Sequence, residues 1–231
     1  MKLFHLITHL LFPPRCVLCR NVLLDEETDL CKSCRRETEI FPTPKTKHPF
    51  LASWTALWYY NGNVRRSLIR FKFYNARSYA SVYGRLLAMK LLEEYPEGFD
   101  LLTWIPISPL RRIRRGYDQV ELIANAVSAE LGLAARPPLK KIRHNRPQSR
   151  ITEYSRRRAN VLGAYEILPD ADITGKRVLL LDDILTPGAP ASEAGRILLT
   201  AGAKQVTAAA VAASTHNSNK HSRGAYAIIF Q

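Results

Sequence analysis

Four cysteines, all within the first 34 residues, form two pairs with the spacing of a metal site. Cys16 and Cys19 make one Cys-x-x-Cys pair, Cys31 and Cys34 make the other, and eleven residues separate the pairs. Each pair can occupy two corners of a tetrahedron around zinc, and four thiolates leave no open position for a substrate. The pattern therefore predicts a structural zinc site, with free thiols or redox-active pairs as the alternative.

A second group of reactive side chains lies near the C-terminus, where an apolar run over 178–181 precedes Asp182 and Asp183. The run predicts a parallel strand that is buried on both faces. A short glycine-containing loop and a helix follow, so two carboxylates and a helix N-terminus meet at one point. The acids suit sugar hydroxyls or hydrated Mg²⁺, and the loop suits a phosphate. An exposed strand end with an ordinary turn is the alternative.

The elements that must position these residues alternate between strands and helices. Apolar runs predict strands at 54–60, 101–105, 178–181, 206–213 and 226–230, and helical periodicity predicts helices at 79–87, 120–131 and 194–201. This order predicts a doubly wound parallel α/β sheet with its ligand crevice at the carboxyl ends of the strands. A proline-rich linker at 41–49 suggests two units: an N-terminal helix with the zinc ribbon at 1–45, and the α/β domain at 46–231.

Composition narrows the class of protein and its ligands. The 231 residues hold 34 Lys plus Arg against 20 Asp plus Glu, a net charge of +14, and 46% are hydrophobic. These values exclude a fibrous or disordered chain and indicate attraction to phosphates. The apolar run at 3–12 is too short and too polar to span a bilayer. We read it as a short amphipathic helix rather than a signal peptide, and expect a cytoplasmic protein.

The segment around the aspartates resembles the phosphoribosyl-pyrophosphate (PRPP) motif of type I phosphoribosyltransferases, in which two acids precede a Thr-Thr-Gly-x-Thr loop. The chain as a whole resembles the ComF competence-protein family, which joins a zinc ribbon to a phosphoribosyltransferase-like domain and is associated with DNA uptake during natural transformation. The segments that carry this resemblance are 11–16, 60–62, 71–73, 105–108, 115–119, 146–149 and 156–160. The resemblance implies a type I phosphoribosyltransferase-like doubly wound sheet with a small N-terminal zinc ribbon.

The same resemblance assigns roles around a PRPP site. Asp182 and Asp183 would be the catalytic acids and would hold the ribose hydroxyls, with Mg²⁺ nearby. The remaining PRPP-binding residues would be Thr186, Gly188 and Ala189 at the 5′-phosphate, and Ile107 and Ser108 at the pyrophosphate.

Two prolines depart from this motif, because Pro187 replaces its second Thr and Pro190 its last. Proline has no N–H, and each hydrogen bond lost to a charged group is worth about 1.5 to 3 kcal/mol. PRPP binding is therefore expected to be roughly a hundredfold weaker than in a loop with both threonines.

Two arginine-rich stretches, at 111–115 and 136–158, suit a second kind of ligand. They predict phosphate contacts to single-stranded DNA, with base stacking on Tyr117 or Tyr154. The residues expected to bind nucleic acid are Arg111, Arg112, Arg114, Arg115, Arg156, Arg157 and Arg158. A solvated cationic surface without a dedicated ligand is the alternative.

Two functions are compatible with these features. The first is a ComF-type protein of DNA uptake that binds PRPP or a related phosphorylated ligand weakly, contacts single-stranded DNA, and meets a helicase of the uptake machinery through the zinc ribbon. The second is an active Mg²⁺-dependent phosphoribosyltransferase acting on an unidentified nitrogenous acceptor.

Overall fold

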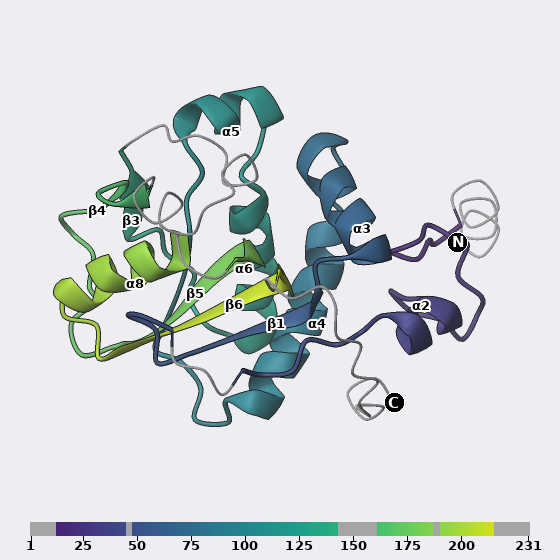
Figure 1. The fold of residues 1–231 in the computed structure, drawn as a ribbon, viewed down its shortest axis with the longest axis horizontal. Helices are drawn as coiled ribbons and strands as arrows, with labels where there is room; N and C mark the ends of the chain where they lie inside the picture. The colour runs from purple at the N-terminus through teal and green to yellow at the C-terminus, as the bar shows by residue number, and fades with distance from the viewer. Residues whose placement is uncertain (1–12, 45–47, 143–160, 187–189, 215–231) are drawn as a thin grey trace, which may run out of the picture.

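A parallel β-sheet with helices on both faces forms the body of the protein (Figure 1). The computed structural model describes residues 13–44, 48–142, 161–186 and 190–214. Four strands pair in the order β1-β6-β5-β2, all parallel. They are β1 (Ser53–Tyr59), β2 (Leu101–Trp104), β5 (Arg177–Leu185) and β6 (Gln205–Ala213). The prediction of a parallel α/β sheet is confirmed, and the strand expected at 226–230 lies outside the described residues.

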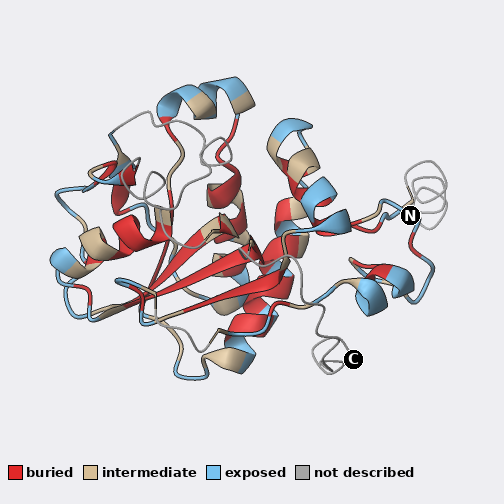
Figure 2. Cartoon of the chain, viewed as in Figure 1, coloured by how far each residue is buried: buried red, intermediate tan, exposed pale blue. Residues whose placement is uncertain are grey.

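Alternate residues of the central strands face two different hydrophobic layers. Leu179 and Leu181 of β5 pack with helices α3 (Gly62–Phe73), α4 (Tyr79–Glu94) and α6 (Gln119–Leu131). Val178 and Leu180 pack with α8 (Pro190–Thr200) on the other face. The period-2 alternation of strand side chains explains why a continuous apolar run serves both layers. Figure 2 shows these strands as the most completely buried part of the chain.

Helix boundaries follow local capping chemistry. Asp118 caps α6, accepting from the backbone N–H groups of Val120 and Glu121, and Gly132 ends it in the left-handed region with φ 62°. Pro190 is the first residue of α8, a position where its missing N–H costs no helical hydrogen bond. Helices α4, α6 and α8 occupy the positions expected for helices at 79–87, 120–131 and 194–201, so these three predictions are confirmed.

A small antiparallel pair, β3 (Leu139–Lys141) and β4 (Tyr165–Ile167), lies apart from the main sheet. The short helix α5 (Pro109–Arg115) follows β2. Helix α5 lies at the end of the sheet where β2 stops pairing with β5, because the last pair is Trp104 with Leu181. Lys141 of β3 and Tyr165 of β4 interact electrostatically with Asp182, so the β3–β4 pair lies near the residues that follow Leu181.

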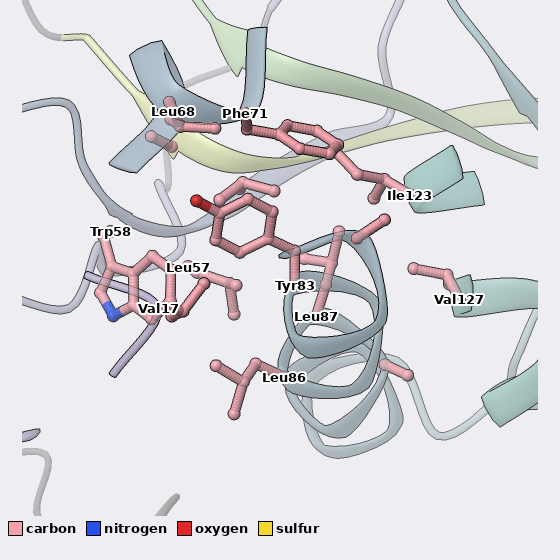
Figure 3. Close-up of a cluster of buried hydrophobic side chains, with 14 of the residues drawn as sticks. Val17, Leu57, Trp58, Leu68, Phe71, Tyr83, Leu86, Leu87, Ile123 and Val127 are labelled. Atoms are coloured by element: carbon pink, nitrogen blue, oxygen red, sulfur yellow. The ribbon is translucent and has the colours of Figure 1, made fainter. Parts of the chain in front are cut away.

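The cysteine-rich segment packs directly on the α/β domain. Val17, which lies between Cys16 and Cys19, packs in one hydrophobic cluster with Trp58 of β1, Leu68 of α3 and Tyr83 of α4 (Figure 3). The buried Leu18 belongs to the same cluster. The start of the linker also contributes to the core: Ile40, just before it, forms an antiparallel bridge with Trp58 of β1, and Phe41, its first residue, is buried and donates its backbone N–H to the Leu57 carbonyl. The ribbon is therefore packed into one hydrophobic layer of the α/β domain and is not a separate unit joined to it by the linker alone.

Among the helices in the described ranges, none combines the length and apolar composition needed to cross a membrane.

Candidate functional site

The four cysteines converge as a metal site requires. Their sulfur atoms all lie within 4.8 Å of one another, and the Sγ atoms of Cys19 and Cys31 are 3.6 Å apart. Four sulfurs placed tetrahedrally at about 2.3 Å from zinc would be separated by about 3.8 Å. Backbone N–H groups point at the sulfurs, with Asn21 N 3.5 Å from Cys19 and Cys34 N 3.5 Å from Cys31, as thiolates require. The residues present therefore fit structural zinc.

The local structure of the ribbon differs in one respect from a simple hairpin. An antiparallel bridge joins Arg15 and Val22 on either side of the first cysteine pair, and the described residues from 23 to 30 form turns and bends without a strand. The second pair sits at the start of the short helix α2 (Lys32–Glu37), with Cys31 as its N-cap. Both pairs are thus held by backbone geometry at their own positions, not by a shared sheet.

The two aspartates lie within β5, not beyond its end. The strand continues to Leu185 because Ile184 and Leu185 pair with Ala212 and Ala213 of β6. Successive residues of a strand point to opposite faces, so Asp182 and Asp183 project into the two different layers. Both lie past the last residue that pairs with β2, at the carboxyl edge where a parallel sheet opens.

Asp183 is held by protein groups. Its Oδ1 lies 2.8 Å from Lys72 Nζ of α3, and its Oδ2 accepts a 2.8 Å hydrogen bond from Gln119 Nε2 of α6. Burial opposes ionisation, but Lys72 and Gln119 outweigh it and hold the pKa of the Asp183 carboxyl below its usual value. Arg115 extends the network, donating to Gln119 Oε1 at 2.7 Å. Asp183 is therefore an ionised, oriented carboxylate that links β5 to α3 and α6.

Asp182 faces a different environment. Burial and the neighbouring Asp183 charge raise the pKa of the Asp182 carboxyl well above its usual value. Lys141 of β3 interacts electrostatically with Asp182, and its ammonium lies 5.1 Å from the centre of the Tyr165 ring. A second cation, Arg111 of α5, interacts with both Lys141 and Tyr165. Burial, and secondarily Arg111, lowers the pKa of Lys141 to about 8. A buried acid and a nearby lysine, both with shifted pKa values, beside a further cation are the arrangement expected of a ligand site.

The segment after β2 is fixed by Asp118. Its Oδ2 accepts a 3.2 Å hydrogen bond from Ile107 N while its Oδ1 caps α6. Ser108 is buried and forms the N-cap position of α5. Ile107 and Ser108, the residues expected at the pyrophosphate, thus lie at the same edge of the sheet as the aspartates, with Ile107 held by Asp118.

The structure places the other expected PRPP-binding residues only in part. Thr186 follows β5 and lines a small hollow with His48, Leu51, Trp54, Leu185 and Ala191. Gly188 and Ala189 lie outside the described residues, as do Arg156, Arg157 and Arg158.

The arginines of α5 have unequal surroundings. Arg112 pairs with Glu121 at 3.0 Å, and Arg115 is engaged by Gln119, whereas the Arg114 side chain is exposed. Tyr117, expected to stack on bases, is buried and donates its hydroxyl hydrogen to the Phe71 carbonyl. Tyr117 is therefore a core residue, and the stacking prediction at this position is wrong.

Sequence reasoning missed Lys72, Gln119, Asp118 and Lys141. All but Lys141 lie in the segments 71–73 and 115–119 that carry the family resemblance, so the motifs were visible although the roles were not. The side chains of Lys72 and Asp183 are 111 positions apart in sequence, and only the packing of α3 against β5 brings them together.

The chain is similar to a zinc ribbon family model and to several competence proteins. Residues 7–46 match the family model of the double zinc ribbon domain. Competence protein F of Haemophilus influenzae is 22% identical over 83% of this chain and 93% of its own length. Competence protein ComFC of Streptococcus pneumoniae is 29% identical over 81% of this chain and 77% of its own length. The chain is a homologue of the ComF competence proteins.

The chain is also similar to a further curated protein and to two solved structures. The DNA utilization protein YhgH of Salmonella typhimurium is 24% identical over 84% of this chain and 94% of its own length. Among solved structures, the allosteric regulatory enzyme of purine biosynthesis aligns with 61% of this chain at 19% identity and a TM-score of 0.40. Glutamine PRPP amidotransferase from B. subtilis aligns at a TM-score of 0.37. The ComF homologue spans less than a third of each of these two enzymes.

Proposed function

We propose that this ComF homologue binds PRPP or a related phosphorylated ribose, with Mg²⁺, at the carboxyl edge of β5, and acts in DNA uptake. The observation that carries the proposal is the asymmetric acid pair beside two cations: Asp182 with Lys141 and Arg111 on one face, Asp183 anchored on the other. A carboxylate suits ribose hydroxyls or Mg²⁺, and the cations suit the phosphates. The names of the relatives, competence protein F and competence protein ComFC, support the proposed role in DNA uptake.

Different residues would bind the ribose, the 5′-phosphate and the pyrophosphate of the ligand. Asp182 would accept from the ribose hydroxyls, and Asp183 would support it from the other face of β5. Thr186, Gly188 and Ala189 would surround the 5′-phosphate at the start of α8, while Ile107 and Ser108 would face the pyrophosphate. If turnover occurs, the protein is a phosphoribosyltransferase whose acceptor is a nitrogenous base.

The test is isothermal titration of the full chain with PRPP in the presence and absence of Mg²⁺. We expect weak, Mg²⁺-dependent binding that Asp182→Asn abolishes, while Asp170→Asn, at an exposed acid, leaves it unchanged. Pro187→Thr combined with Pro190→Thr should strengthen binding by roughly a hundredfold, since two backbone donors return to the loop. Binding that ignores Mg²⁺ and Asp182→Asn would contradict the proposal.

A second ligand, single-stranded DNA, is supported by the surface formed by the end of α3 and by α5. Phe73, Tyr74, Leu110 and Ile113 are 56%, 73%, 60% and 79% exposed, among arginines that include Arg114. The Arg115 guanidinium lies 5.1 Å from the centre of the Phe73 ring, which joins the two elements into one surface. Aromatic rings among arginines suit stacked bases and their phosphates. The contact of the zinc ribbon with a helicase stays an expectation from the family resemblance.

The DNA proposal is tested by fluorescence anisotropy with a labelled oligonucleotide over a salt series. We expect Phe73→Ala to weaken binding at all salt concentrations, by an amount corresponding to about 1 to 3 kcal/mol. Arg114→Ala should reduce the slope of log affinity against log salt by about 0.7, the share of one phosphate contact. Arg36→Ala, at an exposed arginine of α2, is the matched control and should leave the slope unchanged.

A further inference from the structure

Helix α3 lies between the zinc ribbon and Asp183 and makes polar contacts with both. The Ser67 hydroxyl donates to the Val17 carbonyl, and Arg70 Nη2 donates to the Leu18 carbonyl at 2.6 Å. Val17 and Leu18 are the two residues between Cys16 and Cys19, so these contacts grip the first cysteine pair itself. At the other end of the network, Lys72 Nζ lies 2.8 Å from Asp183 Oδ1.

The spacing of these residues places the two sets of contacts on opposite sides of one helix. Asn63, Ser67 and Arg70 recur at i, i+4 and i+7, which brings them to one face. Asn63 Nδ2 reaches the Cys34 sulfur at 3.8 Å, so this face touches both cysteine pairs. Lys72 comes two residues after Arg70, roughly 200° further around the helix at 3.6 residues per turn, and points away from the ribbon.

The helix is also packed firmly between these contacts. Val64, Leu68 and Phe71 are buried, and the Phe71 and Tyr83 rings meet edge to face with their centres 5.4 Å apart. The Tyr117 hydroxyl donates to the Phe71 carbonyl, which is one residue before Lys72. Because packed interiors have discrete arrangements and do not deform freely, a shift of α3 on the ribbon side must move Lys72.

We propose that the zinc ribbon positions Lys72 against Asp183 through α3, which makes Lys72 a positioning residue of the acid-pair site and ties the geometry of that site to bound zinc. The inference rests on the proposed function only in treating the acid pair as a ligand site. Coupling between two sites is reciprocal, so loss of the Lys72 contact must also weaken the hold of the ribbon on zinc.

The first experiment breaks the link on the ribbon side. Arg70→Met keeps an apolar stem but loses the donors to Val17 and Leu18. In the zinc-loaded full chain, carboxyl ¹³C NMR, with the Asp183 signal assigned by Asp183→Asn, should show a higher titration midpoint for Asp183. The dissociation constant for PRPP with Mg²⁺ should rise about tenfold, within the usual range of coupling between sites. Arg70→Lys should recover part of both effects, and Arg65→Met, at an exposed arginine of the same helix, should produce neither.

The second experiment breaks the link on the acid side and reads zinc. Lys72→Met should weaken the equilibrium affinity for zinc, measured by competition with a chromophoric chelator, at least about fivefold, whereas Lys140→Met, at an exposed lysine, should not. An unmoved Asp183 titration in Arg70→Met, or an unchanged zinc affinity in Lys72→Met, would overturn the inference. If PRPP binds none of the proteins, the proposed function fails, but the Asp183 signal and the zinc affinity still decide the coupling.

Discussion

Replacing Lys72 with methionine removes the cation from a buried ion pair and leaves the Asp183 carboxylate with the Gln119 amide as its direct partner. The two side chains are 17% and 7% exposed, so solvent screens the charge poorly. Removing one partner of such a pair costs about 3 to 5 kcal/mol, because the other charge stays buried without compensation. We expect Lys72→Met to lower the free energy of unfolding by about 3 kcal/mol at pH 8.

The loss of stability caused by Lys72→Met should become smaller as the pH falls. In the natural protein the pKa of Asp183 lies below its ordinary value, so this group contributes stability above the unfolded pKa and loses it as pH falls through the folded pKa. In Lys72→Met burial dominates and the pKa rises above the ordinary value. The carboxyl then takes up a proton as pH falls toward 5, and the penalty shrinks by about 1.4 kcal/mol for each unit by which its pKa exceeds the assay pH.

Urea denaturation at pH 5 and pH 8 measures both effects, with Lys140→Met as the surface control. The double variant Lys72→Met with Asp183→Asn should be less destabilised than the sum of the two single variants, by about 1 to 3 kcal/mol. Equal penalties at the two pH values, or a double variant that is strictly additive, would refute the idea that Lys72 and Asp183 form a compensated buried pair.

Three further perturbations test other parts of the molecule. Cys16→Ser should remove zinc, measured by elemental analysis, and lower the melting temperature, because Val17 and Leu18 belong to the domain core; a zinc-free variant that melts like the natural protein would contradict this. Binding of PRPP with Mg²⁺, followed by titration calorimetry, should weaken as pH rises through about 8, because the Lys141 ammonium loses its proton, and Lys141→Met should remove this dependence. Gly84→Ala should lower the urea midpoint by an amount equivalent to about 1 to 3 kcal/mol, since the new Cβ would lie 2.3 Å from Ala126 Cβ where α4 crosses α6, and an unchanged midpoint would show that the helices separate freely.

The elements of the sheet were predictable because each has a local signal. Apolar runs gave β1, β2, β5 and β6, and the 3.6-residue period with Gly132 as a terminator gave α6. The cysteine spacing likewise predicted a cluster that the fold confirms. The length of β5 was not predictable in the same way, because the polar pair at 182–183 interrupts the apolar pattern while pairing with β6 continues to Leu185.

The contacts that decide the site are long-range and carry no local signal. A lysine between two phenylalanines, as at 71–73, is typical of a solvated helix face, and the sequence does not indicate that it meets Asp183. Tyr117 shows the converse, since an aromatic residue beside arginines suggests stacking, whereas the fold buries it. In both cases tertiary packing sets the surroundings of a side chain whose type alone favours another role.

The strand geometry gives two identical neighbours different tasks. Because Asp182 and Asp183 lie on opposite faces of β5, one carboxylate lies beside Lys141 and Arg111 and the other meets Lys72 and Gln119. Burial raises the pKa of Asp182, and the charge of Asp183, stabilised by its partners, raises it further across the strand, so the anchored acid tunes the one that faces the proposed ligand. A cation or a sugar hydroxyl bound at Asp182 would relieve that repulsion. We therefore expect the anchoring of Asp183 from α3 to affect binding of the proposed ligand even though Lys72 lies in the opposite layer.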